Sequence, residues 1–185
     1  MTKSYTHHDN PEIMNCRKII LLLMFLFELF SASAQNRQIG LELSWSRACL
    51  GYRYQFAALP FWNEIYAGLG NEDINRDFDD FQFGIKTGMS LFSRPRTVLY
   101  GFVNLGMYFP ENNYYRANTP FLGAGTGIRK FFGKGKRQSI FTEFSYRYGH
   151  TWYTQSYNRD GISVKTAGKF RLQPVSISIG YGFRF

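Results

Sequence analysis

Residues 172–185, which read LQPVSISIGYGFRF, alternate strictly between apolar and small or polar side chains. One face of this segment carries Val175, Ile177, Ile179, Tyr181, Phe183 and Phe185, and the other carries Ser176, Ser178, Gly180, Gly182 and Arg184. A period of two is the period of a β-strand. The apolar face of such a strand must turn either into a protein core or outward to lipid. The segment therefore constrains the chain to a β fold with one apolar surface.

The same alternation recurs along the chain, between short segments rich in turn residues. It is clear in residues 81–91, 99–109, 122–128, 140–148 and 175–185. Residues 39–45 and 50–56 also alternate, but in opposite phases, and a further short strand is expected over 63–69. A phase change near residues 46–49 indicates either a turn or a bulge. With a turn there the count is eight strands, an even number as single-chain bacterial barrels require. We predict an all-β fold, a closed antiparallel up-and-down transmembrane β-barrel of eight strands.

The links between these segments differ in length in a regular way. The links near Pro60, Pro95 and Gly133 are short, whereas residues 70–80, 110–120 and 150–170 form long ones. Outer-membrane barrels have short periplasmic turns and long external loops. With the last strand ending in the periplasm, the long links all fall outside, except that the first external link is short. The link lengths therefore agree with eight strands and with a last strand that ends in the periplasm.

The N-terminal region has the pattern of a secretory signal peptide. Arg17 and Lys18 precede an apolar run over residues 19–30, interrupted by Glu28, and residues 31–34 read SASA. A charged segment, an apolar run of this length and an Ala-x-Ala site predict export with cleavage after Ala34. Residues 1–34 are thus an N-terminal extension plus signal peptide, with Met1 or Met14 as the start, and residues 35–185 form one barrel domain in the bacterial outer membrane.

The aromatic face at the end of the chain resembles the C-terminal signature strand of bacterial outer-membrane β-barrels. The matching residues are Tyr181, Phe183 and Phe185. The resemblance implies that the outer-membrane assembly machinery recognises this strand. Over residues 35–185 the strand pattern resembles the OmpA/OmpX-type membrane domains, which implies the fold and the location but no particular ligand.

Composition and charge fit an exported barrel with lipid partners. Aromatic residues make up 19% of the chain and there are 18 glycines, as aromatic girdles and small lumen residues require. The net charge is +9, and the leader removes equal numbers of basic and acidic residues. Export argues against nucleic acid, so membrane lipid and lipopolysaccharide phosphates are the expected partners. Cys49 is the one cysteine after the leader, and we expect it to be a small buried residue.

A barrel of eight strands has a lumen that side chains fill, or that holds one small ligand at most. Strand alternation turns a set of charged residues inward. The predicted lumen charge network consists of Glu42, Arg53, Lys86, Arg129, Glu143, Arg147 and Arg184. Buried charges must pair, so the network is interpreted as a plug. A polar conduit or gated pore is the alternative.

One long link weakly resembles a calcium-binding loop. Asp73, Asn75, Asp77 and Asp79 alternate as the first ligands of such a loop do. The required glycine is absent from the sixth position, and the twelfth position holds Gly84 instead of glutamate. We therefore predict a solvated acidic loop, no metal site and no cofactor.

The last long link resembles, at one position, the barrel-embedded lipid A deacylases. His150 stands at a strand end as the histidine of those enzymes does. Their pattern has a serine two residues later and then a glutamate, but here Trp152 follows and no glutamate comes after it. Ser156 and Asp160 would have to complete the site, so we predict that the chain is not an enzyme.

The predicted external loops carry exposed aromatic residues beside asparagine, in residues 111–116 and 151–158. Tyr and Trp provide contact area at low entropic cost, so these loops suit a carbohydrate or protein ligand. The expected function is that of a small outer-membrane barrel with a structural or surface-binding role. The alternatives are a lipid A-modifying enzyme of the outer leaflet and a secreted soluble β-barrel with its apolar face inward.

Overall fold

The structure is a computed structural model that describes residues 37–56, 59–72, 78–111, 117–159 and 162–185. Contacts divide the chain into two units, Met1–Ala34 and Gln35–Phe185, and every described residue belongs to the second. The predicted signal peptide therefore lies outside the described residues. In the part of the chain that is described, no helix has the length and apolar character needed to cross a membrane.

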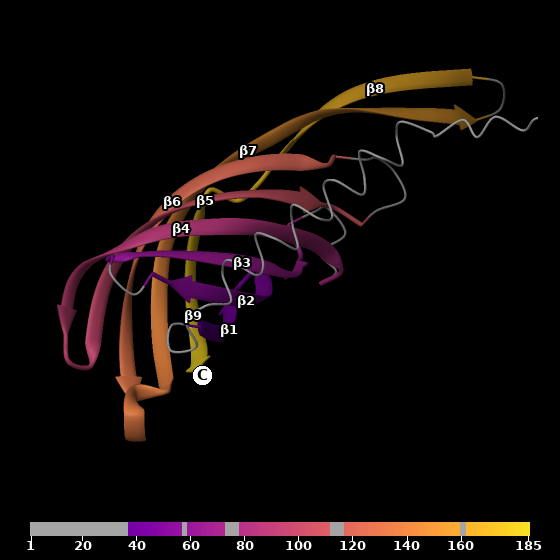
Figure 1. Ribbon diagram of the computed structural model, residues 1–185. Helices are drawn as coiled ribbons and strands as arrows, with labels where there is room; N and C mark the ends of the chain where they lie inside the picture. Colours follow the sequence, from indigo (N-terminus) through magenta and orange to yellow (C-terminus); the bar gives the residue numbers. More distant parts are fainter. Residues whose placement is uncertain (1–36, 57–58, 73–77, 112–116, 160–161) are drawn as a thin grey trace, which may run out of the picture. The chain divides into compact units, whose positions relative to one another are not determined.

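The second unit is a closed barrel of eight antiparallel strands, which confirms the predicted fold (Figure 1). The strands are β1 (Arg37–Ser44), β2 (Arg47–Gln55), β3 (Phe61–Gly70), β4 (Asp80–Arg94), β5 (Thr97–Phe109), β6 (Thr119–Phe132), β7 (Gln138–Arg159), β8 (Ile162–Arg171) and β9 (Val175–Arg184). Neighbouring strands pair in sequence from β1 to β7, and β9 closes the barrel between β7 and β1. β8 pairs with β7 alone and stands outside the wall.

The apolar face of each barrel strand points outward. Ile179 is 58% exposed, for example, whereas its neighbour Ser178 is buried inside. The same inversion holds for Ile65 beside Glu64 on β3. A soluble barrel with its apolar face inward needs the opposite arrangement, so that alternative is wrong for this fold.

The barrel has two different ends, which we call the turn end and the hairpin end. The turn end carries the β4–β5 turn at Pro95 and Arg96, the short 3₁₀ turn η2 (Lys134–Lys136) and the last residues of β9. The hairpin end carries the β1–β2 turn, which occupies only Trp45 and Ser46. A turn and not a bulge thus separates the first two strands, and it is shorter than predicted.

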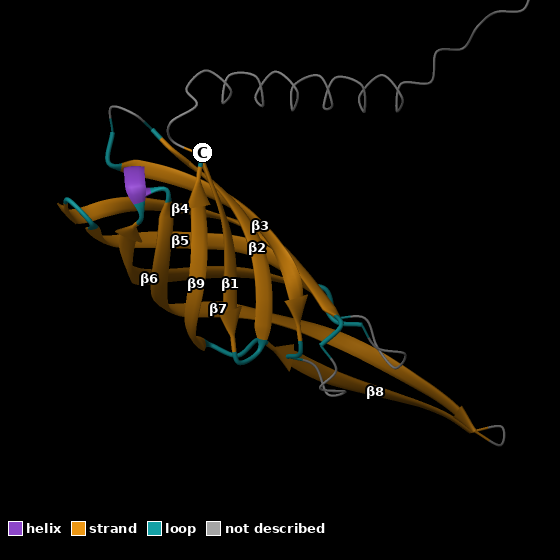
Figure 2. Ribbon diagram, turned by 90° about the horizontal axis from the view of Figure 1, so that it is seen from below, coloured by secondary structure: helices purple, strands orange, loops and turns teal. Residues whose placement is uncertain are grey.

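A hairpin of β7 and β8 projects beyond the barrel wall at the hairpin end (Figure 2). The barrel part of β7 pairs with β9 as far as Tyr146 and Val175. From His150 onward β7 pairs with β8 instead, over ten residue pairs that correspond to roughly 30 Å of strand. The prediction of a loop over residues 150–170 is therefore wrong. Residues 151–154 read TWYT, and such β-branched and aromatic residues favour a strand that continues past the barrel wall.

A break between β8 and β9 brings the chain back to the wall. Leu172 is buried and its amide donates to the Gly149 carbonyl at 3.1 Å. Pro174 has no amide to donate, and its carbonyl accepts from the Arg147 amide at 2.6 Å. The eighth barrel strand, β9, starts directly after this proline.

Candidate functional site

Three carboxylates and three cations meet in the middle of the lumen, from five strands. This central cluster consists of Glu42, Arg47, Arg53, Glu64, Lys86 and Glu143. The Lys86 ammonium contacts all three carboxylates: it donates to Glu42, lies 2.6 Å from Glu143 Oε2 and lies 3.7 Å from Glu64 Oε1. All six side chains are buried.

Arg53 joins two of the carboxylates and packs on an aromatic ring. Its Nε donates to Glu64 Oε2 at 2.6 Å, and its Nη2 lies 3.4 Å from Glu143 Oε1. The guanidinium carbon is 3.6 Å from the centre of the Trp62 ring, as in a cation–π contact. Tyr100 donates a further hydrogen bond to Glu143 at 2.8 Å. The cluster is therefore balanced in charge and bonded at every member, as burial requires.

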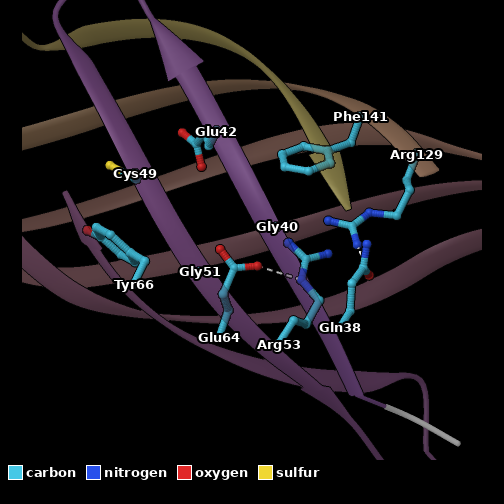
Figure 3. Close-up of a pocket in the computed structure, with 10 residues that line it drawn as sticks. All are labelled: Gln38, Gly40, Glu42, Cys49, Gly51, Arg53, Glu64, Tyr66, Arg129 and Phe141. Carbon is cyan, nitrogen blue, oxygen red and sulfur yellow. Dashed lines mark hydrogen bonds and ion pairs between the residues drawn. The ribbon is translucent and has the colours of Figure 1, made fainter. Parts of the chain in front are cut away.

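Large rings opposite glycines fill the space around the central cluster. A Cβ on Gly180 would lie 2.1 Å from the Phe141 ring, and one on Gly88 would lie 2.2 Å from the Trp62 ring. Figure 3 shows the cavity that remains, with the Arg53–Glu64 ion pair on one side and Arg129 beside Gln38 on the other. Its volume is about 10 Å³, room for about one water molecule. The lumen is filled at this level.

A second group of polar contacts covers the lumen at the hairpin end. Arg147 pairs with Glu72, whose other carboxylate oxygen accepts from the Gln173 amide at 2.9 Å. The Glu72 amide in turn donates to Asp80 at 3.0 Å and to the Tyr108 hydroxyl at 2.9 Å. These contacts fasten the β3–β4 link to the link between β8 and β9.

At the turn end, Arg129 and Arg184 have no carboxylate partner among the described residues. Arg129 donates to Gln38, and its guanidinium carbon lies 4.5 Å from the Phe141 ring centre. The Arg184 guanidinium carbon lies 4.6 Å from the Phe131 ring centre. The predicted lumen residues thus all face inward, but they form three groups and not one network.

Four charged members of these groups are absent from the predicted network: Arg47, Glu64, Glu72 and Asp80. Glu64 is on β3, where the outward residues Ile65 and Leu69 indicate an inward glutamate. Arg47 falls in the stretch where the sequence predicts a turn after the first strand. Glu72 lies after the end of β3, and no strand periodicity indicates its direction.

The other predicted site residues do not come together in the described part of the chain. His150 lies on β7 with its ring edge-on to Tyr148, at 5.3 Å between ring centres. Ser156 lies on the same strand but its side chain is not described, and Asp160 lies outside the described residues. Of the acidic loop, Asp79 is exposed, whereas Asp73, Asn75 and Asp77 lie outside the described residues. No group of three metal-binding side chains occurs among the residues that are described.

The aromatic face of β9 lies on the outside of the barrel. Tyr181, Phe183 and Phe185 are all exposed there. Cys49 is buried on the inner face of β2, where its sulfur accepts from Gln82 Nε2 at 3.1 Å.

No protein-family model matches the chain, and no curated protein is significantly similar to it in sequence. Among solved structures, it is similar to a major outer membrane protein from Thermus thermophilus. The TM-score is 0.52 at 14% identity, over 83% of this chain and 100% of that chain. A KdgM porin aligns with a TM-score of 0.27 at 10% identity, over 81% of this chain and 99% of that chain. The first similarity shows that the chain has the fold of an outer-membrane β-barrel.

Proposed function

We propose that this chain is an exported outer-membrane barrel of OmpA/OmpX-type architecture, closed to solutes, which binds at the cell surface through its β7–β8 hairpin. Residues 1–34 serve as the signal peptide, and the assembly machinery recognises the β9 face of Tyr181, Phe183 and Phe185. The location is supported by the band of outward apolar side chains, since water would destabilise so large an apolar surface. The hairpin end then faces outward and the turn end faces the periplasm.

The filled lumen is the observation that supports a barrel closed to solutes. Conduction requires a continuous water path, whereas the mid-lumen cavity holds about one water molecule and is lined by four charged side chains, Glu42, Arg53, Glu64 and Arg129. Planar lipid bilayers with the purified residues 35–185 test this. We expect no discrete current steps. Steps that persist after repurification, and that change with Lys86→Gln, would contradict the closed state.

The hairpin supports a surface-binding role because it extends far beyond what closing the barrel requires. Trp152 is 71% exposed on it, and the Lys169 ammonium lies 5.4 Å from the centre of that ring. Lys165 and Arg171 add exposed basic groups on β8. An aromatic ring beside cations suits sugar rings and phosphates, so we assign lipopolysaccharide as the first partner.

Replacing residues 152–169 by a two-residue Asn-Gly turn tests the hairpin without touching the β7–β9 pairing. We expect the shortened barrel to fold, and to lose binding to lipopolysaccharide in nanodiscs whose phospholipid is held constant. Retained binding would contradict this partner, and binding to a surface protein or glycan instead would keep the hairpin role but change its ligand.

We further propose that the chain has no hydrolytic activity, since the histidine at the strand end lacks a serine and a glutamate at the spacing of the deacylases. Acyl transfer needs a nucleophile, a base and a group that orients the base. Mass spectrometry of lipid A from cells with the wild type, with His150→Ala and without the protein tests this. We expect three identical spectra. An acyl chain whose loss depends on His150 would support the enzyme alternative.

A further inference from the structure

A basic cavity opens at the turn end of the barrel, which we call the vestibule. Its volume is about 290 Å³, far larger than the cavity in the middle of the lumen. Five cationic side chains line it, and no acidic side chain does so in the described part of the chain: Arg53, Arg94, Arg129, Lys136 and Arg184. Trp62, Tyr100 and Phe131 form part of its wall.

Most of these cations lack a neutralising partner. Arg53 is paired with Glu64 and Glu143, but the other four have no carboxylate within 4.0 Å among the residues that the structure describes. Arg129 is only 4% exposed, and its Nε has no hydrogen-bond partner there. A buried guanidinium with an open donor costs free energy unless something accepts from it.

The acidic side chains are distributed unevenly along the barrel axis. Every described Asp and Glu side chain belongs to the central cluster or to the hairpin end, in Glu72, Asp79, Asp80 and Glu111. All charged side chains described at the turn end are basic. A concave surface of one sign between low-dielectric walls concentrates counter-ions.

The turn between β6 and β7 holds one of the cations in an unfavourable backbone conformation. Lys136 has φ 54°, and it is the one described non-glycine residue with a positive φ. Gly133 and Gly135 beside it also have positive φ, which allows the sharp 3₁₀ turn η2. A lysine in this region is uncommon and costs backbone strain. The side chain of this strained residue, Lys136, lines the vestibule.

From these observations we propose that the vestibule binds a phosphate-bearing anion from the turn-end side of the membrane. Arg129 and Arg94 supply planar guanidinium forks for phosphate oxygens, and Lys136 and Arg184 supply further positive charge. Because four of the cations lack carboxylate partners, a ligand with more than one negative charge fits better than chloride. This site lies at the opposite end from the hairpin and does not depend on the proposed surface binding.

The test is calorimetric titration with pyrophosphate of residues 35–185 in phosphatidylcholine nanodiscs, which leave both barrel ends accessible. Chloride at equal ionic strength serves as the reference anion. We expect saturable binding that the double variant Arg94→Gln/Lys136→Gln weakens by about tenfold or more, since it removes two charge-assisted contacts. The matched control is Lys130→Gln/Lys134→Gln, at two exposed positions that do not line the vestibule, with the same loss of charge and unchanged binding.

Both variants leave the central cluster intact, and retention of the heat-dependent gel shift shows that they are folded. No saturable binding, or equal weakening in the two double variants, would overturn the proposal. A second arm replaces part of the phosphatidylcholine with phosphatidylglycerol. Competition with pyrophosphate in the wild type, lost in Arg94→Gln/Lys136→Gln, identifies a lipid headgroup as the source of the phosphate. Its absence identifies a free phosphate compound.

Discussion

Lys86 holds the middle of the barrel together at the scale of single residues. It is the one described cation that contacts Glu42, Glu64 and Glu143 at once. The remaining cations reach only part of this set, since Arg47 pairs with Glu42 and Arg53 pairs with the other two. Removing the ammonium leaves three buried carboxylates that share two guanidinium groups, so charge and hydrogen bonding both become unbalanced.

We expect Lys86→Met to lower the free energy of unfolding by about 3–5 kcal/mol, the usual cost of breaking a buried ion pair from one side. Denaturant titration in lipid vesicles measures this. Adding Glu143→Gln should recover part of the loss, because it removes one of the unpaired charges. The control is Lys130→Met, at an exposed position on the outer face of β6, with little effect. Equal losses at Lys86 and Lys130 would contradict the role of the central cluster.

Alternation predicts most of the charged residues that face the lumen, but not which of them pair. Arg53 and Glu143 are 90 residues apart, and they meet only because the strands cross the barrel at a particular stagger. The period of two contains no information about that stagger. For the same reason the sequence could not show that Arg129 and Arg184 remain apart from the carboxylates.

At the scale of elements, β7 has two environments along one strand. In its first part apolar and polar side chains alternate, because one face is exposed outside the wall and the other faces the lumen. Beyond Gly149 the strand pairs with β8 alone and leaves the barrel wall, although Phe170 at the base of the hairpin still stacks on Tyr108. The one-sided apolar alternation therefore ends although the strand continues. Periodicity therefore does not predict the hairpin, since it reports burial on one side and not strand pairing itself.

An arginine substitution should destabilise the barrel wall much more than the projecting hairpin. Ile179→Arg places a cation on the outward face of β9 in the wall and should cost about 2–4 kcal/mol in lipid vesicles. Val164→Arg, at a 47% exposed position on β8, should cost almost nothing, because the hairpin lies in water. Denaturant titration of both variants against the wild type gives the comparison. Similar costs at the two positions would mean that the outward face of β9 does not contact lipid.

For the whole molecule, the closure of the sheet into a barrel determines how the backbone polar groups are satisfied. β1 pairs with β9 over seven residue pairs, so the barrel has no free edge in its wall. Every backbone polar group in the wall can then bond to a neighbour, which is what a spanning structure needs in hydrocarbon. The filled lumen adds a second, internal set of contacts that must break before the wall opens.

Closure predicts a barrel that is both membrane-bound and slow to open in detergent. We expect residues 35–185, exported in a Gram-negative host, to fractionate with outer membranes, and the unheated protein to migrate differently from the boiled protein on a detergent gel. Lys86→Met should convert to the boiled form at a lower temperature, because fewer internal contacts then hold the strands.

Ile179→Arg should reduce the membrane-bound fraction, and Val164→Arg should not. Recovery of the wild type as a soluble periplasmic monomer would contradict the membrane location, since the outward apolar band would then have to be stable in water.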